Sequence, residues 1–276
     1  LIPAGVTIKT LFNMEGKTVY VAGTLDYESS DWWGKGEIRV LKGGKFIGFK
    51  KQGNAGIEFL GQNKIINYGT IAAPQNATNL TIANQIVDNH GSLDLSGKNL
   101  ILSNNAVLNV TGTLKAKTLS ITNSEVYSGC SANISDFVYI SNDSELHVSY
   151  LHCKNFKQDS GGKVVVKDQS MIECDNVFMN LNSQQGTYAL GETDAVCVIK
   201  AAKLAFNAPG PDAENKIRCN MFTTSGERAG FIVDVPEDKI YGITNDYEKT
   251  LGALSDYQHG QVVRPKDISI TEEGYG

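Results

Sequence analysis

The first feature of the chain is a pattern of paired apolar positions that recurs about every 21 residues. Each pair holds two apolar or small residues separated by one residue. A constant period in this range indicates a solenoid, whose units bury their apolar edges by stacking on one another. The pairs are Leu25/Tyr27, Phe46/Gly48, Ile71/Ala73, Leu93/Leu95, Leu114/Ala116, Ala132/Ile134, Leu151/Cys153, Ile172/Cys174, Ala195/Cys197 and Ile217/Cys219.

Two further alternating segments occupy each repeat, such as those around Leu100–Leu102 and Leu108–Val110. Alternation of apolar and polar residues over a few positions is typical of β-strands. The sequence therefore predicts an all-β protein, a single-stranded parallel β-helix of about ten rungs of about 21 residues with terminal caps. The crossover preference of parallel strands predicts a right-handed coil. A β-sandwich is the main alternative, although its strands need no constant period.

The pattern also divides the chain. Residues 1–17 hold a short apolar segment that we expect to cap the first rung, because open solenoid ends are unpaired sheet edges. Residues 18–222 form the predicted β-helix, and residues 223–276 supply C-terminal cap strands and a polar linker tail. The tail leads us to expect a flanking domain outside this chain.

Two columns predict the corners of the coil. Asparagines recur about every 19 or 20 residues, each after an alternating strand, and asparagine tolerates left-handed backbone at turns. Their amides could also bond to one another along the axis, while catalytic or glycosylation roles are the alternatives. Glycines recur before the paired positions and predict a positive φ there. The columns are Asn84, Asn104, Asn123 and Asn142, and Gly23, Gly69, Gly91 and Gly112.

Four of the five cysteines, Cys153, Cys174, Cys197 and Cys219, fall in one repeat column, and Cys130 lies outside it. Neighbouring rungs lie about 4.8 Å apart, whereas the Cβ atoms of a disulfide lie about 3.8 Å apart. We therefore expect stacked free thiols that act as small hydrophobic groups. A disulfide and a zinc site are the alternatives.

Composition and motifs narrow the function classes. The 25 basic and 30 acidic side chains give a net charge of −5, which argues against nucleic acid as a partner. No apolar run reaches the roughly 18–20 residues of a membrane span. The sequence contains no nucleotide-binding loop, nucleophilic serine motif or calcium loop, and its four histidines are scattered. We therefore expect no cofactor and no metal.

The outward positions of the strand before each apolar pair carry candidate chemistry at Glu125, Tyr127, Glu145 and His147. One interpretation is a solvated face with charge pairs between rungs. Another is a glycan-binding or hydrolytic groove, in which Glu125 and Glu145 would act as a glycosidase pair.

Trp32 and Trp33 are adjacent in a glycine-flanked insertion, and they are the only tryptophans. An exposed indole could serve as a platform for a sugar ring or a partner side chain. Anchoring of the insertion against the rod is the alternative.

The rungs that contain N-Y-G-T-I (67–71), N-H-G-S-L (89–93) and V-T-G-T-L (110–114) resemble β-solenoid segments of Bacteroidetes cell-surface proteins. Such segments often precede a C-terminal domain of the LruC/DUF4842 type. The resemblance covers about residues 1–220, and the acidic D-Y-N-D signature of the C-terminal domain is absent. It implies a secreted or outer-surface protein with adhesive or glycan-contacting roles.

The sequence thus predicts a non-enzymatic stalk or adhesin, extracellular or on the outer cell surface, that contacts a glycan or a protein partner. The alternative is a carbohydrate-active enzyme, either a polysaccharide lyase or a glycoside hydrolase.

Overall fold

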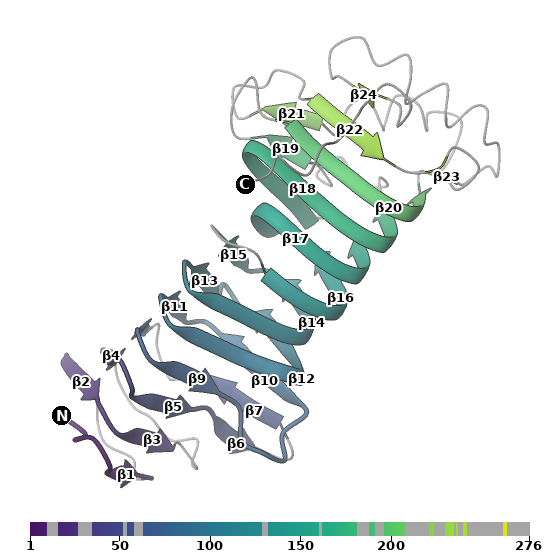
Figure 1. The fold of residues 1–276 in the computed structure, drawn as a ribbon. Helices are drawn as coiled ribbons and strands as arrows, with labels where there is room; N and C mark the ends of the chain where they lie inside the picture. The colour runs from purple at the N-terminus through teal and green to yellow at the C-terminus, as the bar shows by residue number, and fades with distance from the viewer. Residues whose placement is uncertain are drawn as a thin grey trace.

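A computed structural model describes residues 1–9, 16–26, 35–51, 54–57, 63–128, 132–159, 162–180, 188–190, 196–207, 221–223, 230–234, 236, 240–241 and 262–263. The described residues form strands and turns without a helix, and the strands stack into an elongated coil (Figure 1). All the strand pairings are parallel except that of β6 (Phe49–Lys51) with β7 (Asn54–Ile57). The predicted parallel β-helix is therefore confirmed, with about seven turns within the described residues.

Three parallel ladders run along the axis of the coil. Ladder 1 begins with β2 (Lys17–Val21) and β4 (Gly36–Val40). It continues through β8 (Lys64–Asn67), β11 (Ile86–Asn89), β13 (Val107–Val110), β15 (Glu125–Ser128) and the first parts of β17 (Ser144–Gln158) and β18 (Gly162–Asn180), and then β19 (Tyr188–Leu190) and β21 (Met221–Thr223).

Ladder 2 contains the paired apolar positions. It runs through β1 (Thr7–Ile8), β3 (Thr24–Asp26), β5 (Lys45–Ile47), β9 (Thr70–Ala72), the first parts of β12 (Ser92–Ser103), β14 (Thr113–Thr122) and β16 (Ala132–Ser141), the middle of β17 and β18, and then β20 (Val196–Asn207), β22 (Gly230–Asp234) and β24 (Val262–Val263). Ladder 3 joins β7, β10 (Asn79–Ala83), the ends of β12, β14, β16, β17, β18 and β20, and β23 (Ile240–Tyr241).

The predicted core column is confirmed through most of its length. Strand register places each first member of an apolar pair beside the next, and every one is at most 3% exposed. A contiguous buried file of this kind supplies each turn with its own slice of core. Its members are Leu25, Phe46, Ile71, Leu93, Leu114, Ala132, Leu151 and Ile172.

The column differs from the prediction at its C-terminal end. Ile172 pairs with Ile199, and Cys197 lies opposite Ser170 rather than opposite Cys174. The placement of Cys197 in the cysteine column was therefore wrong. The coil turn from Ile172 to Ile199 spans 27 residues, whereas the preceding one from Leu151 to Ile172 spans 21. The six extra residues shift the register that the constant period predicted. Cys130 and Cys219 lie outside the described residues.

The asparagine corners are confirmed. Asn84, Asn104, Asn123 and Asn142 adopt φ values of 54°, 55°, 46° and 50°, in the left-handed region that asparagine tolerates. Hydrogen bonds between amides of successive turns occur in other columns, as between Asn67 Nδ2 and Asn89 Oδ1 at 2.6 Å.

The glycine column has a different cause from the one predicted. Gly23, Gly69, Gly91 and Gly112 do not have a positive φ. Instead, each stacks directly on the backbone of the preceding turn. A Cβ added at Gly91 would lie 2.3 Å from the carbonyl oxygen of Gly69, and one at Gly112 would lie 2.1 Å from that of Gly91. Glycine is required there by the close approach of two backbones.

The N-terminal residues cover the first turn. Ile2 is 2% exposed and forms a parallel bridge with Val21, while β1 pairs with β3. Among the described residues there is no helix long and apolar enough to cross a bilayer.

Candidate ligand-binding face

The outer surface of ladder 1 carries four of the six candidate residues, and the structure brings these four together. In β15 the side chains of Val126 and Ser128 point inward and are buried, so Glu125 and Tyr127 point outward. Register places Glu125 beside Glu145 and Tyr127 beside His147 on β17. We call these four residues the β15–β17 cluster.

Short contacts organise the β15–β17 cluster. The phenol of Tyr127 donates a hydrogen bond to Glu125 Oε2 at 2.7 Å, and His147 Nε2 lies 3.1 Å from Glu145 Oε2. The rings of Tyr127 and His147 stack, with centroids 4.0 Å apart and an interplanar angle of 21°. The face of the cluster therefore combines an aromatic platform with two carboxylates.

The carboxylates also strengthen the binding of the phenol proton. The hydrogen bond to Glu125, partial burial and the charges of Glu125 and Glu145 raise the pKa of Tyr127 to about 12. Tyr127 is therefore a neutral hydrogen-bond donor at physiological pH and not a base. Tyr127 is nevertheless 36% exposed, so a ligand can reach its ring.

A second aromatic stack lies at the corner that directly follows the strands of ladder 1, nearer the N-terminus. The rings of Tyr68 and His90 stack with centroids 4.9 Å apart, and His90 Nδ1 lies 2.6 Å from Thr111 Oγ1. One further ring, that of Tyr20, lies 5.9 Å from the guanidinium of Arg39. Tyr20 and Tyr68 are 40% and 53% exposed, so within the described residues ladder 1 and the corner that follows it carry three exposed tyrosines, Tyr127 included.

Polar side chains occupy the turns between these rings. Asp88 accepts a hydrogen bond from Asn109 Nδ2 at 2.6 Å and pairs with Lys64 Nζ at 2.7 Å. Partial desolvation opposes ionisation of Asp88, but these two partners outweigh it and hold the pKa of the carboxyl below its usual value. This part of the face is therefore a charged, hydrogen-bonded surface.

Sequence reasoning missed Tyr20, Tyr68 and His90. The signal for one stack was present, because the tripeptides Asn67-Tyr68-Gly69 and Asn89-His90-Gly91 align one repeat apart. Tyr20 could not be assigned in the same way, because the next position of its column is Arg39 and not an aromatic residue. Trp32 and Trp33 themselves lie outside the described residues.

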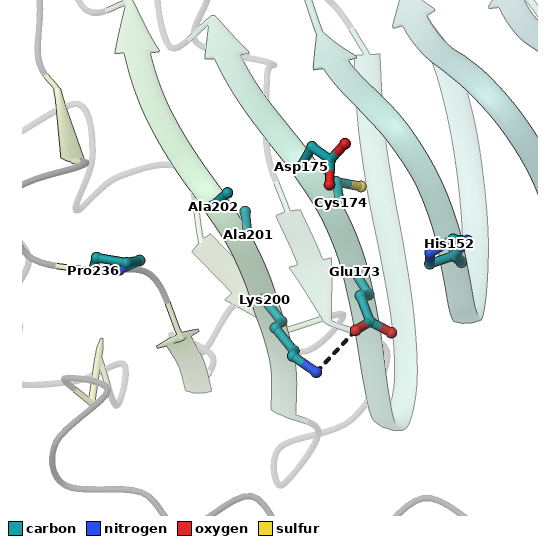
Figure 2. Close-up of a pocket in the computed structure, with 8 residues that line it drawn as sticks. All are labelled: His152, Glu173, Cys174, Asp175, Lys200, Ala201, Ala202 and Pro236. Carbon is teal, nitrogen blue, oxygen red and sulfur yellow. Dashed lines mark ion pairs between the residues drawn. The ribbon is translucent and has the colours of Figure 1, made fainter.

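A pocket of about 360 Å³ lies on ladder 2, over β17, β18 and β20 (Figure 2). Glu173 is its central charge, with Oε1 2.9 Å from Lys200 Nζ and Oε2 accepting a hydrogen bond from the Tyr150 phenol at 2.8 Å. His152 and Asp175 complete the polar lining. We call this hollow the Glu173 pocket.

The Glu173 pocket holds an ionised carboxylate. Hydrogen bonds from Lys200 and Tyr150 lower the pKa of Glu173 despite partial desolvation. Burial and the hydrogen bond to Glu173 raise the pKa of Tyr150 to about 12. At neutral pH the pocket therefore offers neither a protonated carboxylic acid at Glu173 nor a phenolate at Tyr150.

The sequence did not predict this pocket, because Lys200 meets Glu173 only through the shifted register of β20. Within the residues that the structure describes, no three His, Cys, Asp or Glu side chains are arranged to hold a metal ion.

Comparison of the chain with family models, with curated proteins and with solved structures finds no match.

Proposed function

We propose that this protein is a non-enzymatic β-helix, secreted or on the outer cell surface, that binds a glycan on the outer face of ladder 1. The observation that carries the proposal is the series of exposed tyrosine rings on that face, two of them stacked on a histidine of the next turn. The resemblance of its rungs to those of surface β-solenoids supports the location.

The chemistry of the face suits a sugar polymer. Exposed aromatic rings are amphipathic and pack against the apolar faces of sugar rings. The stack on a histidine holds the rings of Tyr68 and Tyr127 in place before a ligand arrives, which reduces the ordering cost of binding. Around Tyr127, Glu125 and Glu145 supply oxygen atoms that can accept hydrogen bonds from sugar hydroxyls.

The geometry of the face suits an extended ligand. Tyr20 and Tyr127 share one register column and are separated by five turns, or roughly 24 Å at the usual strand spacing. A polymer that follows the axis would contact several rings at once, so weak contacts add through their high effective concentration.

A glycan array probed with the full chain tests the proposal. We expect binding to at least one oligosaccharide class, and Tyr127→Ala should weaken it about tenfold, equivalent to about 1.4 kcal/mol. The matched control is Tyr139→Ala, since Tyr139 belongs to the β16 part of ladder 3 and packs beside Lys157. Absence of binding to every glycan, or an equal loss in Tyr139→Ala, would contradict the proposal. Binding to proteins alone would replace it with a protein-adhesion role.

A carbohydrate-active enzyme is the second candidate, and the Glu173 pocket is the observation that favours it. Two carboxylates, an imidazole and an ammonium line one hollow, as a hydrolytic or lytic site requires. We rank this candidate second because an ionised Glu173 cannot act as a general acid and a neutral Tyr150 cannot act as a base. A turnover screen with acidic and neutral polysaccharides distinguishes the two, because hydrolysis or lysis abolished by Glu173→Gln would establish an enzyme.

A further inference from the structure

Two cysteines meet inside the coil, where the ladder 2 segments of β17 and β18 lie side by side. Cys153 lies directly opposite Cys174, one turn later, and their sulfur atoms are 3.2 Å apart. Both residues are reduced in this structure and buried, at 2% and 6% exposure.

The approach of the sulfur atoms answers the geometric objection to a disulfide between rungs. Neighbouring parallel strands are about 4.8 Å apart, within the 4.4–6.8 Å that a disulfide allows between Cα atoms. The side chains already incline toward each other, because their sulfurs are closer than the strands that carry them. Closing the bond to about 2.05 Å requires a sulfur movement of roughly 1.2 Å.

Among the described cysteines, the register pairs only these two. The next position of the column after Cys174 is Ala201, and Cys197 lies opposite Ser170. Within the described residues, therefore, a third thiol does not stack on the pair.

We propose that Cys153 and Cys174 are a site of oxidative modification, forming a disulfide that joins two consecutive turns of the β-helix when the chain meets a small-molecule disulfide. The proposal is independent of the glycan-binding function and concerns a different ladder. It adds a reversible covalent link to the stacked free thiols that the sequence predicts.

The Glu173 pocket gives the oxidant a route to the pair. Cys174 is one of the residues that line the pocket (Figure 2). Cys153 lies deeper, and its hydrogen bond with Cys174 and its burial raise the pKa of its thiol, so it stays protonated. The exchange therefore begins at Cys174.

The exchange balances in two steps. The thiolate of Cys174 attacks the oxidant disulfide, forms a mixed disulfide and releases one thiol of the oxidant. The sulfur of Cys153 then attacks the Cys174 sulfur and releases the second thiol, and the two protons of the protein thiols end on the two released thiols. The protein loses two electrons, and the oxidant disulfide gains them.

The link would act on the coil itself. The disulfide closes a loop of one full turn and restricts the unfolded chain, which stabilises the folded protein. It lies next to the Glu173 pocket, whose lining includes Cys174. Oxidising extracellular conditions, in which disulfides persist, would favour the linked form.

Mapping of thiols in the full chain tests the proposal. The chain is refolded from denaturant in a buffer of reduced and oxidised glutathione, alkylated with a maleimide under denaturing conditions, digested and examined by mass spectrometry. We expect a peptide pair joined through Cys153 and Cys174 that separates on reduction. The thermal midpoint of the linked protein should exceed that of the same protein after reduction.

The matched variants are Cys153→Ser and Cys174→Ser, each of which removes one sulfur and preserves side-chain volume approximately. In both variants we expect the remaining cysteine to carry a maleimide or a glutathione, and the effect of reductant on the midpoint to disappear. Recovery of wild-type Cys153 and Cys174 as maleimide adducts without prior reduction would overturn the proposal. A link from either residue to Cys130, Cys197 or Cys219 would overturn it as well.

Discussion

Substitution of Gly91 by alanine tests the stacking geometry most directly. A Cβ at this position would lie 2.3 Å from the carbonyl oxygen of Gly69, 2.7 Å from the carbonyl carbon of Tyr68 and 2.9 Å from the amide nitrogen of Gly69. All three neighbours are backbone atoms, so no side-chain rotation can relieve the contact. The two turns must separate instead.

The expected loss in the free energy of unfolding has two parts, the overfilled contact and a weakened hydrogen bond. Raising the shortest contact to 3.0 Å moves the backbones apart by about 0.7 Å. Overfilling a packed site costs about 1–3 kcal/mol. The same carbonyl of Gly69 accepts the Ser92 N–H hydrogen bond at 2.8 Å, and weakening that bond adds roughly 1 kcal/mol. We therefore expect Gly91→Ala to lower the free energy of unfolding by about 2–4 kcal/mol.

Gly97→Ala is the matched control. Gly97 has a φ of +77° and no atom within 4 Å of an added Cβ, so alanine there costs only the left-handed backbone penalty of about 1 kcal/mol. Urea denaturation followed by far-ultraviolet circular dichroism compares the two variants. Exchange of the Ser92 amide hydrogen adds a local measurement, and it should be faster in Gly91→Ala alone. A Gly91→Ala protein as stable as Gly97→Ala would refute the close-packing explanation.

Three further substitutions probe the columns of ladder 1. Asn89→Ala removes the acceptor of a buried amide and should cost about 1–3 kcal/mol, measured by urea denaturation. The carboxyl of Asp88 has a lowered pKa in the folded protein, so its stabilising contribution is present above about pH 4 and is lost as pH falls further. Asp88→Asn should therefore flatten the acid side of the stability profile, and an unchanged profile would contradict the pairing of Asp88 with Lys64. Glu125→Gln should shift the pKa of Tyr127 from about 12 toward 10 in an NMR titration of the phenol carbon, and a midpoint still near 12 would contradict the assigned cause.

Periodicity predicted the fold because a β-helix repeats one physical environment at each turn. A residue such as Leu93 is buried by Ile71 below it and Leu114 above it, so the apolar pattern records the core directly. The prediction was wrong where a turn changed length. The period cannot reveal a longer turn, because only the pairing of Ile172 with Ile199 fixes the register there.

Glycine illustrates a second limit. A glycine in the sequence can reflect either of two structural requirements, a positive φ or a close approach of two backbones. A positive φ of 77° favours glycine at Gly97, within β12, whereas backbone contact between turns requires it at Gly91. Only coordinates separate the two, because the contact partner of Gly91 is a backbone atom 22 positions away in the chain.

The candidate site was predictable to the extent that its residues share one column. Glu125 and Glu145, like Tyr127 and His147, occupy equivalent positions of successive repeats, and they meet as expected. The Glu173 pocket involves Lys200, beyond the irregular turn, and could not be derived from spacing. The sequence therefore predicts which residues are neighbours along the axis wherever the turn length stays constant.

The proposed glycan-binding face and the proposed disulfide site lie in different columns of the coil. The β15–β17 cluster lies on ladder 1, whereas the cysteine pair lies in the ladder 2 segments of β17 and β18. The two sites share no residue. Effects at sites without shared partners are close to additive. Cys153→Ser should therefore preserve glycan binding, and Tyr127→Ala should preserve the disulfide. Loss of both properties from either single substitution would mean that these turns respond as one cooperative unit rather than as independent columns.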